Sequence, residues 1–308
     1  MQSYTDFETI LVDNCSTDDS VCYVNKQYPN VRVEKNINND GTAGGFNFGA
    51  KKALGKYLLF LCNDISLEVD CVKKILNAVE TKNASICGVK NLSFWEHNKI
   101  DNVGHTTDIF GFLYPRGSGQ TDRGQFDNQA GICAVSGTCL MVSKTFFEEL
   151  GGFDPKYFTL ADEIDLCWRA RLWGYKVYVE TDAKMYHKIS VTLKKLNRGR
   201  LRYLSERNTM RTLIKNYSGP TLVQIFPFYF GVLFMEGSFY LTLTRVNLAI
   251  AIIKSIFWNI SNFPSTWKLR MYVQSKRKVS DSTLKKDMIK TSLKVDMLKT
   301  WLKGGFNI

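Results

Sequence analysis

The chain has 308 residues, 44% of them hydrophobic, and is therefore long enough to bury a substantial core. Its net charge of +12 is uneven, because residues 1–190 carry 20 Lys or Arg against 24 Asp or Glu, whereas residues 191–308 carry 21 against 5. A tail with a net charge of +16 suits an anionic membrane surface or a nucleic acid. The eight cysteines include no CxxC pair and no signal peptide is visible, which argues against a disulfide scaffold and favours reduced thiols in the cytosol.

Apolar segments and helical patterns alternate along the first part of the chain. This alternation predicts an α/β fold with a mainly parallel sheet. The predicted strands are 7–12, 31–34 and 57–61, and the predicted helices are 20–27, 46–54 and 69–81.

The pattern is less regular after residue 85. Residues 91–130 are rich in Gly, Asp and aromatic residues and predict loops or a small hairpin. Around them we expect strands at 85–90, 134–142 and 176–180, and helices at 144–150, 163–172 and 201–215.

The most informative motif is an acidic cluster, Asp162, Glu163 and Asp165, at the start of a predicted helix. The positive end of a helix dipole favours carboxylates in this place. Crowded carboxylates also repel one another, which raises the pKa of one toward the range of a useful base. The motif therefore predicts a catalytic base.

Two further carboxylates follow predicted strands, where α/β folds bind ligands. Asp13 and Asp64 could each accept a hydrogen bond from a nucleotide base or hold a divalent cation against a diphosphate. Taken alone, Asp13 suits an Asx turn or helix cap better, and Asp64 could equally cap the next helix.

A glycine-rich run, Gly41–Gly49, precedes a predicted helix and would let the backbone approach a ligand closely. It lacks both the Walker A ending and the dinucleotide-binding spacing, so it is weak evidence of a site. His187 follows the last predicted strand, and a structural role and a functional role are about equally expected for it.

Residues 220–235 carry no charge, but Glu236, Arg245 and Lys254 interrupt the apolar pattern that follows. The run falls short of a clean membrane span, which needs about 20 apolar residues. We expect interfacial helices lying on a membrane, with a helical subdomain of solvated basic surface as the alternative.

Five motifs in order carry a family resemblance: VDNCSTDDS, NNDGTAGGFNFGAKKALGKYLLFLCND, SGTCLMVSKTFFEELGGFDPKYF, ADEIDLCWRARLWGYK and a final YH. Over about residues 4–215 the chain resembles the family 2 glycosyltransferases of GT-A fold, and especially their rhamnosyltransferase-like branch. The segments RNTMRTLIKN and KRKVSD also resemble that branch. The implied domains are a GT-A domain at 1–215 and a basic, amphipathic helical extension at 216–308.

The resemblance implies roles for these residues. Glu163, with Asp162 second, would be the catalytic base, although the pair reads Asp-Glu where the family more often has Glu-Asp. Asp64 would hold Mg²⁺ or Mn²⁺ against the donor diphosphate, and His187 would assist at that metal. The remaining donor-binding residues would be Asp13, Asp18, Gly44, Gly45, Asn47 and Asn63.

The implied reaction is inverting transfer of a sugar from a UDP- or dTDP-sugar to a lipid-linked or growing glycan, at the cytoplasmic face of the cell membrane. Relative to the family, the chain begins near the second strand, so the first strand is expected to be absent. The second hypothesis is therefore a catalytically inactive scaffold that binds a membrane or a partner. A nucleic-acid partner is not expected, because no nucleic-acid-binding motif accompanies the basic tail.

Overall fold

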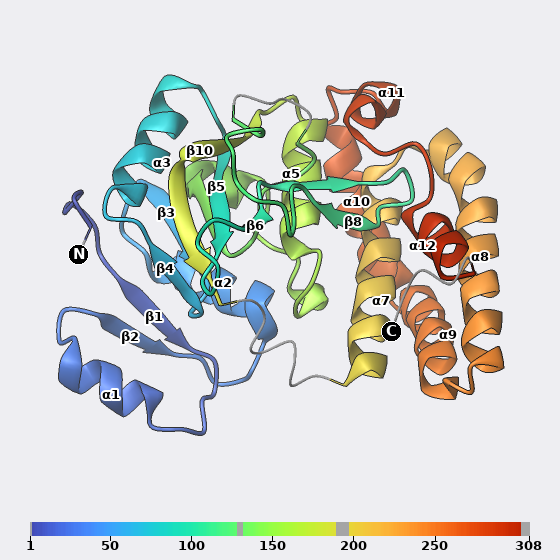
Figure 1. Ribbon diagram of the computed structural model, residues 1–308, viewed down its shortest axis with the longest axis horizontal. Coiled ribbons are helices and arrows are strands. Elements are labelled where there is room, and N and C mark those ends of the chain that lie inside the picture. The colour runs from blue at the N-terminus through green and yellow to red at the C-terminus, as the bar shows by residue number, and fades with distance from the viewer. Residues whose placement is uncertain (1, 128–131, 189–196, 303–308) are drawn as a thin grey trace.

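The computed structural model describes residues 2–127, 132–188 and 197–302 (Figure 1). Residues 128–130 of the segment predicted as loops, and residues 303–308 of the predicted extension, lie outside this part of the chain. A small two-stranded sheet occupies one end of the molecule and a group of long helices the other, with a larger sheet between them (Figure 1).

The N-terminal strands β1 (Ile10–Asp13) and β2 (Arg32–Lys35) pair in parallel and are joined by helix α1 (Ser20–Gln27). Helix α2 (Gly41–Lys52) packs beside β1. The glycine-rich run is therefore helical, and the loop predicted for it is wrong. The glycines let α2 approach its neighbours: a Cβ on Gly41 would lie 2.1 Å from the carbonyl oxygen of Phe158, and its φ is +70°.

The central sheet is mixed, so the prediction of a mainly parallel sheet is wrong. Its strand order is β3-β9-β5-β10-β4, and β6 pairs with the C-terminal part of β5, at Asn91 and Leu92. Of its pairs, β5 and β10 run parallel and the others antiparallel. The strands are β3 (Tyr57–Leu61), β4 (Ile65–Leu67), β5 (Ile86–Ser93), β6 (Ile100–Asn102), β9 (Cys139–Ser143) and β10 (Val177–His187).

The connections between the strands explain why the sheet is mixed. Parallel neighbours need a crossover, usually a helix. The described residues between β5 and β9 contain β6 and the hairpin of β7 (His105–Thr107) with β8 (Leu113–Pro115), but no helix, and β9 returns antiparallel to β5. Helices α3 (Cys71–Thr81) and α4 (Lys144–Glu149) and the 3₁₀ turn η1 (Pro155–Tyr157) complete this part.

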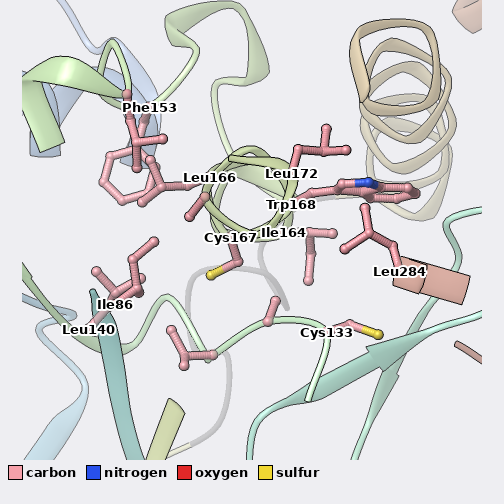
Figure 2. Packing of buried hydrophobic residues seen from close by; sticks show 14 of the residues in the cluster. Ile86, Cys133, Leu140, Phe153, Ile164, Leu166, Cys167, Trp168, Leu172 and Leu284 are labelled. Carbon is pink, nitrogen blue, oxygen red and sulfur yellow. The ribbon is translucent and has the colours of Figure 1, made fainter. Parts of the chain in front are cut away.

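Helix α5 (Asp162–Leu172) lies in the middle of the core, and nine of its eleven residues are buried. Figure 2 shows Ile164, Leu166, Cys167 and Trp168 pointing from it in several directions into the surrounding apolar side chains. A helix buried on nearly every side cannot rotate or slide without opening cavities. The acidic residues of its first turn are therefore fixed by the packing of the rest of the helix.

The C-terminal helices share this core. The rings of Trp168 and Tyr217 meet edge to face at 4.9 Å, and the indole nitrogen of Trp173 donates to the carbonyl of Val273 at 3.0 Å. One apolar cluster thus crosses the predicted boundary at residues 215/216. The elements are α7 (Arg198–Asn216), α8 (Gly219–Thr242), α9 (Val246–Ser261), α10 (Phe263–Ser275), α11 (Asp281–Leu284), η2 (Lys285–Asp287) and α12 (Leu293–Leu302).

Among the described residues, α8 is long and apolar enough to cross a membrane, and α9 with α10 would count as a second such element if the 68° bend between them is ignored. Length and composition alone support this reading. One side of α8 packs on the protein, with Ile225, Tyr229 and Leu233 buried. Part of the basic charge is also internal, because Arg211 and Lys215 are each only 1% exposed.

Candidate active site

Asp64, His187 and Asp101 form one polar group at the edge of the central sheet. His187 is the last residue of β10, because this strand continues seven residues beyond the predicted end at 180. Its Nε2 lies 3.5 Å from a carboxylate oxygen of Asp64, and its Nδ1 lies 2.9 Å from Asp101. Burial lowers the pKa of His187, but the hydrogen bond and charge of Asp101, with the charge of Asp64, outweigh it and raise that pKa.

These residues fit one half of a divalent metal site. A carboxylate and an imidazole that face each other are suitable ligands, and a carboxylate on the far imidazole nitrogen is the usual support for a ligating histidine. The described residues contain no group of three or more His, Cys, Asp or Glu that could hold a metal by itself. Mg²⁺ and Mn²⁺ at phosphate sites need only one or two protein ligands, because the substrate's phosphates supply others.

Asp162 and Glu163 open helix α5, where Asp162 is 5% exposed and Glu163 is half-buried. Burial raises the pKa of both carboxyl groups, and the neighbouring charge of Asp162 raises the pKa of Glu163 further. Their side chains also hydrogen-bond to each other. Two carboxyl groups in contact hold a proton between them, so the pair can accept a second proton near neutral pH.

Cys62 and Gly137 connect these two acidic groups. The Cys62 thiol lies 3.9 Å from the Gly137 carbonyl, and a Cβ on Gly137 would lie 3.4 Å from the Cβ of Glu163. Burial raises the pKa of Cys62 to about 12, with added contributions from the charges of Asp64, Asp162 and Glu163. The fold thus brings together carboxylates that are about 100 residues apart in sequence.

Asp13 ends β1 and accepts a hydrogen bond of 2.8 Å from the backbone nitrogen of Ser16. This hydrogen bond lowers the pKa of Asp13. Asp18 accepts from the backbone nitrogen of Ser20 at 3.2 Å. The Asx turn considered for Asp13 is thus present. Both carboxylates also line a surface depression of about 670 Å³ beside α1, which does not extend to Asp64 or Glu163.

The other predicted donor-binding residues are placed differently. Gly44 and Gly45 lie inside α2, where a Cβ on Gly45 would lie 3.0 Å from the Asn14 amide. Both ends of the Asn47 amide bond the backbone of Phe153, at 2.7 and 3.0 Å, so this side chain fastens α2 to the segment before η1. Asn63 is exposed in the turn beside Asp64.

Asp101 and the backbone segment 136–138 were missed by sequence reasoning. Asp101 lies in the segment predicted as loops or a small hairpin, which carries no motif, and residues 136–138 begin the motif SGTCLMVSKTFFEELGGFDPKYF, for which no role was predicted. Their roles depend on contacts with segments far away in sequence, such as the contact between Asp101 and His187. A single sequence carries no signal for such a contact.

The profile described as Glycosyl transferase family 2 matches residues 1–151. This match includes β1, the Asp64 turn and Gly137, and it ends just before the acidic pair. Residues 1–151 are therefore similar to glycosyl transferase family 2, and the architecture of the chain is the α/β GT-A-like fold.

Three comparisons set the range of similarity. The O-antigen biosynthesis protein RfbC of Myxococcus xanthus is 24% identical over 201 residues, 60% of this chain and 15% of that protein. The N-acetylglucosaminyl-diphospho-decaprenol L-rhamnosyltransferase of Mycobacterium tuberculosis (strain H37Rv) is 37% identical over 59 residues, 19% of each chain. The crystal structure of GalNAc-T7 with UDP, GalNAc and Mn²⁺ superposes on 70% of this chain and 42% of its own, with a TM-score of 0.53 and 14% identity.

The chain spans less than a fifth of the length of RfbC and of the rhamnosyltransferase. The rhamnosyltransferase resemblance accordingly rests on a short segment. The likeness to GalNAc-T7 concerns the fold.

Proposed function

We propose that this chain is an inverting glycosyltransferase that moves a sugar from a nucleoside-diphosphate donor to a hydroxyl acceptor. The observation that carries the proposal is the Asp162–Glu163 pair, held at the start of a buried helix and linked through Gly137 and Cys62 to Asp64 and His187. A base and a diphosphate-binding carboxylate are the two groups that such a transfer needs.

In this mechanism Glu163 takes the proton of the acceptor hydroxyl as its oxygen attacks the anomeric carbon. The new glycosidic bond forms while the bond between the sugar and the diphosphate oxygen breaks. The electron pair of that bond leaves with the nucleoside diphosphate. One displacement from the opposite face inverts the anomeric configuration and needs no covalent sugar–enzyme intermediate. Asp162 stabilises the protonated pair through its hydrogen bond to Glu163.

Asp64 and His187 are the residues that would hold the metal, with Asp101 fixing the ring of His187. Mg²⁺ or Mn²⁺ bound there would neutralise charge on the departing diphosphate. We propose that the depression beside Asp13 and Asp18 takes the nucleoside part of a UDP or dTDP donor, and that Asn63 and the start of α2 contact the rest of the donor.

The names of the relatives support this reading without fixing the substrate. RfbC is an O-antigen biosynthesis protein, the mycobacterial relative acts on a diphospho-decaprenol acceptor, and GalNAc-T7 was crystallised with UDP and Mn²⁺. A rhamnosyl or hexosyl donor and a lipid-linked or growing polysaccharide acceptor are the proposal that these names favour.

The test is calorimetric titration with UDP and dTDP, with and without Mn²⁺, followed by nucleoside-diphosphate release from candidate donors. Metal-dependent binding that is lost in Asp64→Asn, but kept in Asp70→Asn, whose carboxylate pairs with Lys74 at the start of α3, would support the site. A folded chain that binds no nucleotide would contradict the proposal. Binding without any transfer would favour the inactive, partner-binding scaffold.

The C-terminal helices are the proposed membrane contact. Over residues 219–275 the only acidic residue is Glu236, which is salt-bridged to Arg202 and Lys294. The exposed charges on α8–α10 are Lys254 and Lys268. The exposed apolar side chains include Val223, Phe228, Phe230, Phe234, Met235, Leu241, Ile253, Phe257, Ile260 and Trp267.

An apolar surface whose only exposed charges are positive matches the interface of an anionic bilayer. The buried side of α8 argues for helices that lie on the membrane. We place the protein at the cytoplasmic leaflet of the cell membrane, close to lipid-linked acceptors and without a nucleic-acid partner.

Flotation with phosphatidylcholine vesicles, with and without phosphatidylglycerol, tests this contact. The double variant Phe228→Ser/Phe234→Ser should lose at least about tenfold in vesicle affinity. Each substitution removes an aromatic ring whose apolar area would otherwise be buried in the bilayer. Ile37→Ser/Leu54→Ser, which changes two exposed apolar residues of the N-terminal half, is the matched control. Equal binding by wild type and both variants would contradict the proposed surface.

A further inference from the structure

The backbone immediately before the acidic pair is strained. Phe158, Leu160 and Ala161 have φ values of +65°, +71° and +62°, in the left-handed region that residues with a Cβ rarely adopt. Three such residues in a stretch of four persist only where the surroundings hold them. The strained segment 158–161 leads directly into Asp162 and Glu163, so whatever holds it also sets the position of the pair.

Two side chains of helix α7 hold this segment. The Asn208 amide nitrogen donates to the carbonyls of Tyr157, Thr159 and Leu160, at 3.1, 2.8 and 2.7 Å. The neighbouring Arg207 donates to the carbonyls of Lys156 and Tyr157 at 2.9 and 2.6 Å.

Asn208 is fully buried and Arg207 is 7% exposed, so water cannot replace these donors. The Arg207 side chain also donates to the Asn208 amide oxygen at 2.9 Å, which fixes the orientation of that amide.

The next turns of α7 hold the flanks of the acidic pair. Arg211 and Lys215 both contact Asp154, at 2.7 and 2.8 Å, on the N-terminal side of the strained segment. Lys215 also lies 2.9 Å from Asp165, whose other carboxylate contacts are Arg169 and the Asn216 amide.

The polar residues of α7 at 207, 208, 211, 215 and 216 thus hold both sides of the acidic turn. They are the charged and amide positions of the segment RNTMRTLIKN, for which the proposed reaction has no direct use.

We propose that this polar face of α7 is a positioning element for the catalytic base. Asn208 and Arg207 hold the strained segment 158–161, and Arg211, Lys215 and Asn216 fix its flanks, so that Glu163 is aimed at the acceptor hydroxyl. The inference rests on the proposed function, because it assigns the base role to Glu163. The positioning residues do not touch the reacting atoms.

The test compares Asn208→Ala with Glu206→Gln. Glu206 is an equally buried residue of the same helix, but it bonds Lys294 and Arg202 on the other side, away from the strained segment. Asn208→Ala should lower kcat on the order of 100-fold, since a displacement of about 1 Å at a reacting group has an effect of that size. The donor KM and the affinity for UDP with Mn²⁺ should change by less than about threefold, because donor-binding residues are untouched.

Glu206→Gln should keep kcat within about threefold, even where its melting temperature falls as far as that of Asn208→Ala. A second pair separates the hydrogen bond from packing. Arg207→Met keeps the length of the side chain without a donor and should lower kcat, and Arg207→Lys restores one donor in place of the guanidinium fork and should recover part of the loss.

Hydrogen exchange of the amides at 157–161 gives a readout that does not need activity. Exchange there should accelerate in Asn208→Ala and stay unchanged in Glu206→Gln. Unchanged exchange in Asn208→Ala, or a kcat that falls equally in both variants, would overturn the positioning role. If the wild-type chain transfers no sugar, the proposed function fails, whereas the exchange experiment still decides whether α7 holds the segment.

Discussion

The two acidic groups of the proposed site are held in different ways. Asp162 and Glu163 begin a helix buried on nearly all sides and are fixed by a network of buried charges and amides from α7. Asp64 and His187 lie at a sheet edge beside the exposed Asn63, and their visible support is Asp101. The base is therefore preorganised by the protein, whereas the donor side leaves room for ligand atoms to complete it.

The largest expected effect is on the preorganised base. Glu163→Gln should lower kcat by about 10²–10⁴-fold, the usual contribution of a general base, while the affinity for UDP stays nearly unchanged. Measurements of kcat and of the calorimetric Kd for UDP distinguish a loss of catalysis from a loss of donor binding. An unchanged kcat would show that the base lies elsewhere and would remove the distinction between the two sides of the site. The Asp70→Asn variant, which removes a half-exposed carboxylate, is the control for carboxylate loss in general.

The second effect concerns the network behind the base. Burial would raise the pKa of Asp154, but the charges of Lys215 and Arg211 outweigh it and hold that pKa well below its usual range. Asp154→Asn takes the carboxylate partner from the buried Arg211 and leaves the buried Lys215 with Asp165, so the free energy of unfolding should fall by about 3–5 kcal/mol. Urea denaturation measures the loss. A change as small as that of Asp70→Asn would show that α7 does not depend on this network.

The third effect concerns the donor side. Asp101→Asn should weaken Mn²⁺ binding in the presence of UDP by about 10–100-fold, since a carboxylate behind a ligating histidine has an influence of that size. Asp122→Asn is the matched control from the same connection between β5 and β9, because Asp122 contacts Lys90 rather than His187. Titration of Mn²⁺ into the UDP complex measures both. Equal Mn²⁺ affinities in Asp101→Asn and Asp122→Asn would show that His187 is not a metal ligand.

Local chemistry made part of this site predictable from sequence. The carboxylates at 162, 163 and 165 share one helical turn, and Asp64 directly follows an apolar strand, so periodicity alone located them. The α/β class followed from the same patterns. The relative direction of the strands could not be predicted in this way, because it depends on how the chain returns to the sheet after β5.

The supporting residues could not be predicted for the same reason. Asn208 contacts carbonyls about 50 residues earlier in the chain, and Asp101 contacts a histidine 86 residues away. The helical state of the glycine-rich run could not be predicted either, because glycine serves close helix packing as well as ligand binding, and the local sequence is the same in both cases.

The smallest expected effect compares two carboxylates of one helical turn. Because the folded-state pKa of Glu163 is raised by burial and by Asp162, the unfolded chain loses this proton first, and stability falls as pH rises above the ordinary glutamate value of about 4.3. The opposite holds for Asp165. Burial would raise its pKa, but the charges of Lys215 and Arg169 outweigh burial and lower it, so the contribution of Asp165 to stability is lost as pH falls.

Glu163→Gln should therefore stabilise the protein by about 1 kcal/mol at pH 8 and by less at pH 5. Asp165→Asn should destabilise it to a similar extent from pH 5 to pH 8, because a carboxyl group whose folded pKa lies below the ordinary aspartate value of about 3.9 loses its contribution only below that pH. Thermal melts of both variants between pH 5 and pH 8 measure the sign and the pH dependence of each effect. Opposite signs would show that Glu163 is kept for chemistry at a cost in stability, whereas Asp165 is kept for structure. The same sign in both variants would mean that the acidic turn is a single structural cluster, and the contrast between base and network would be lost.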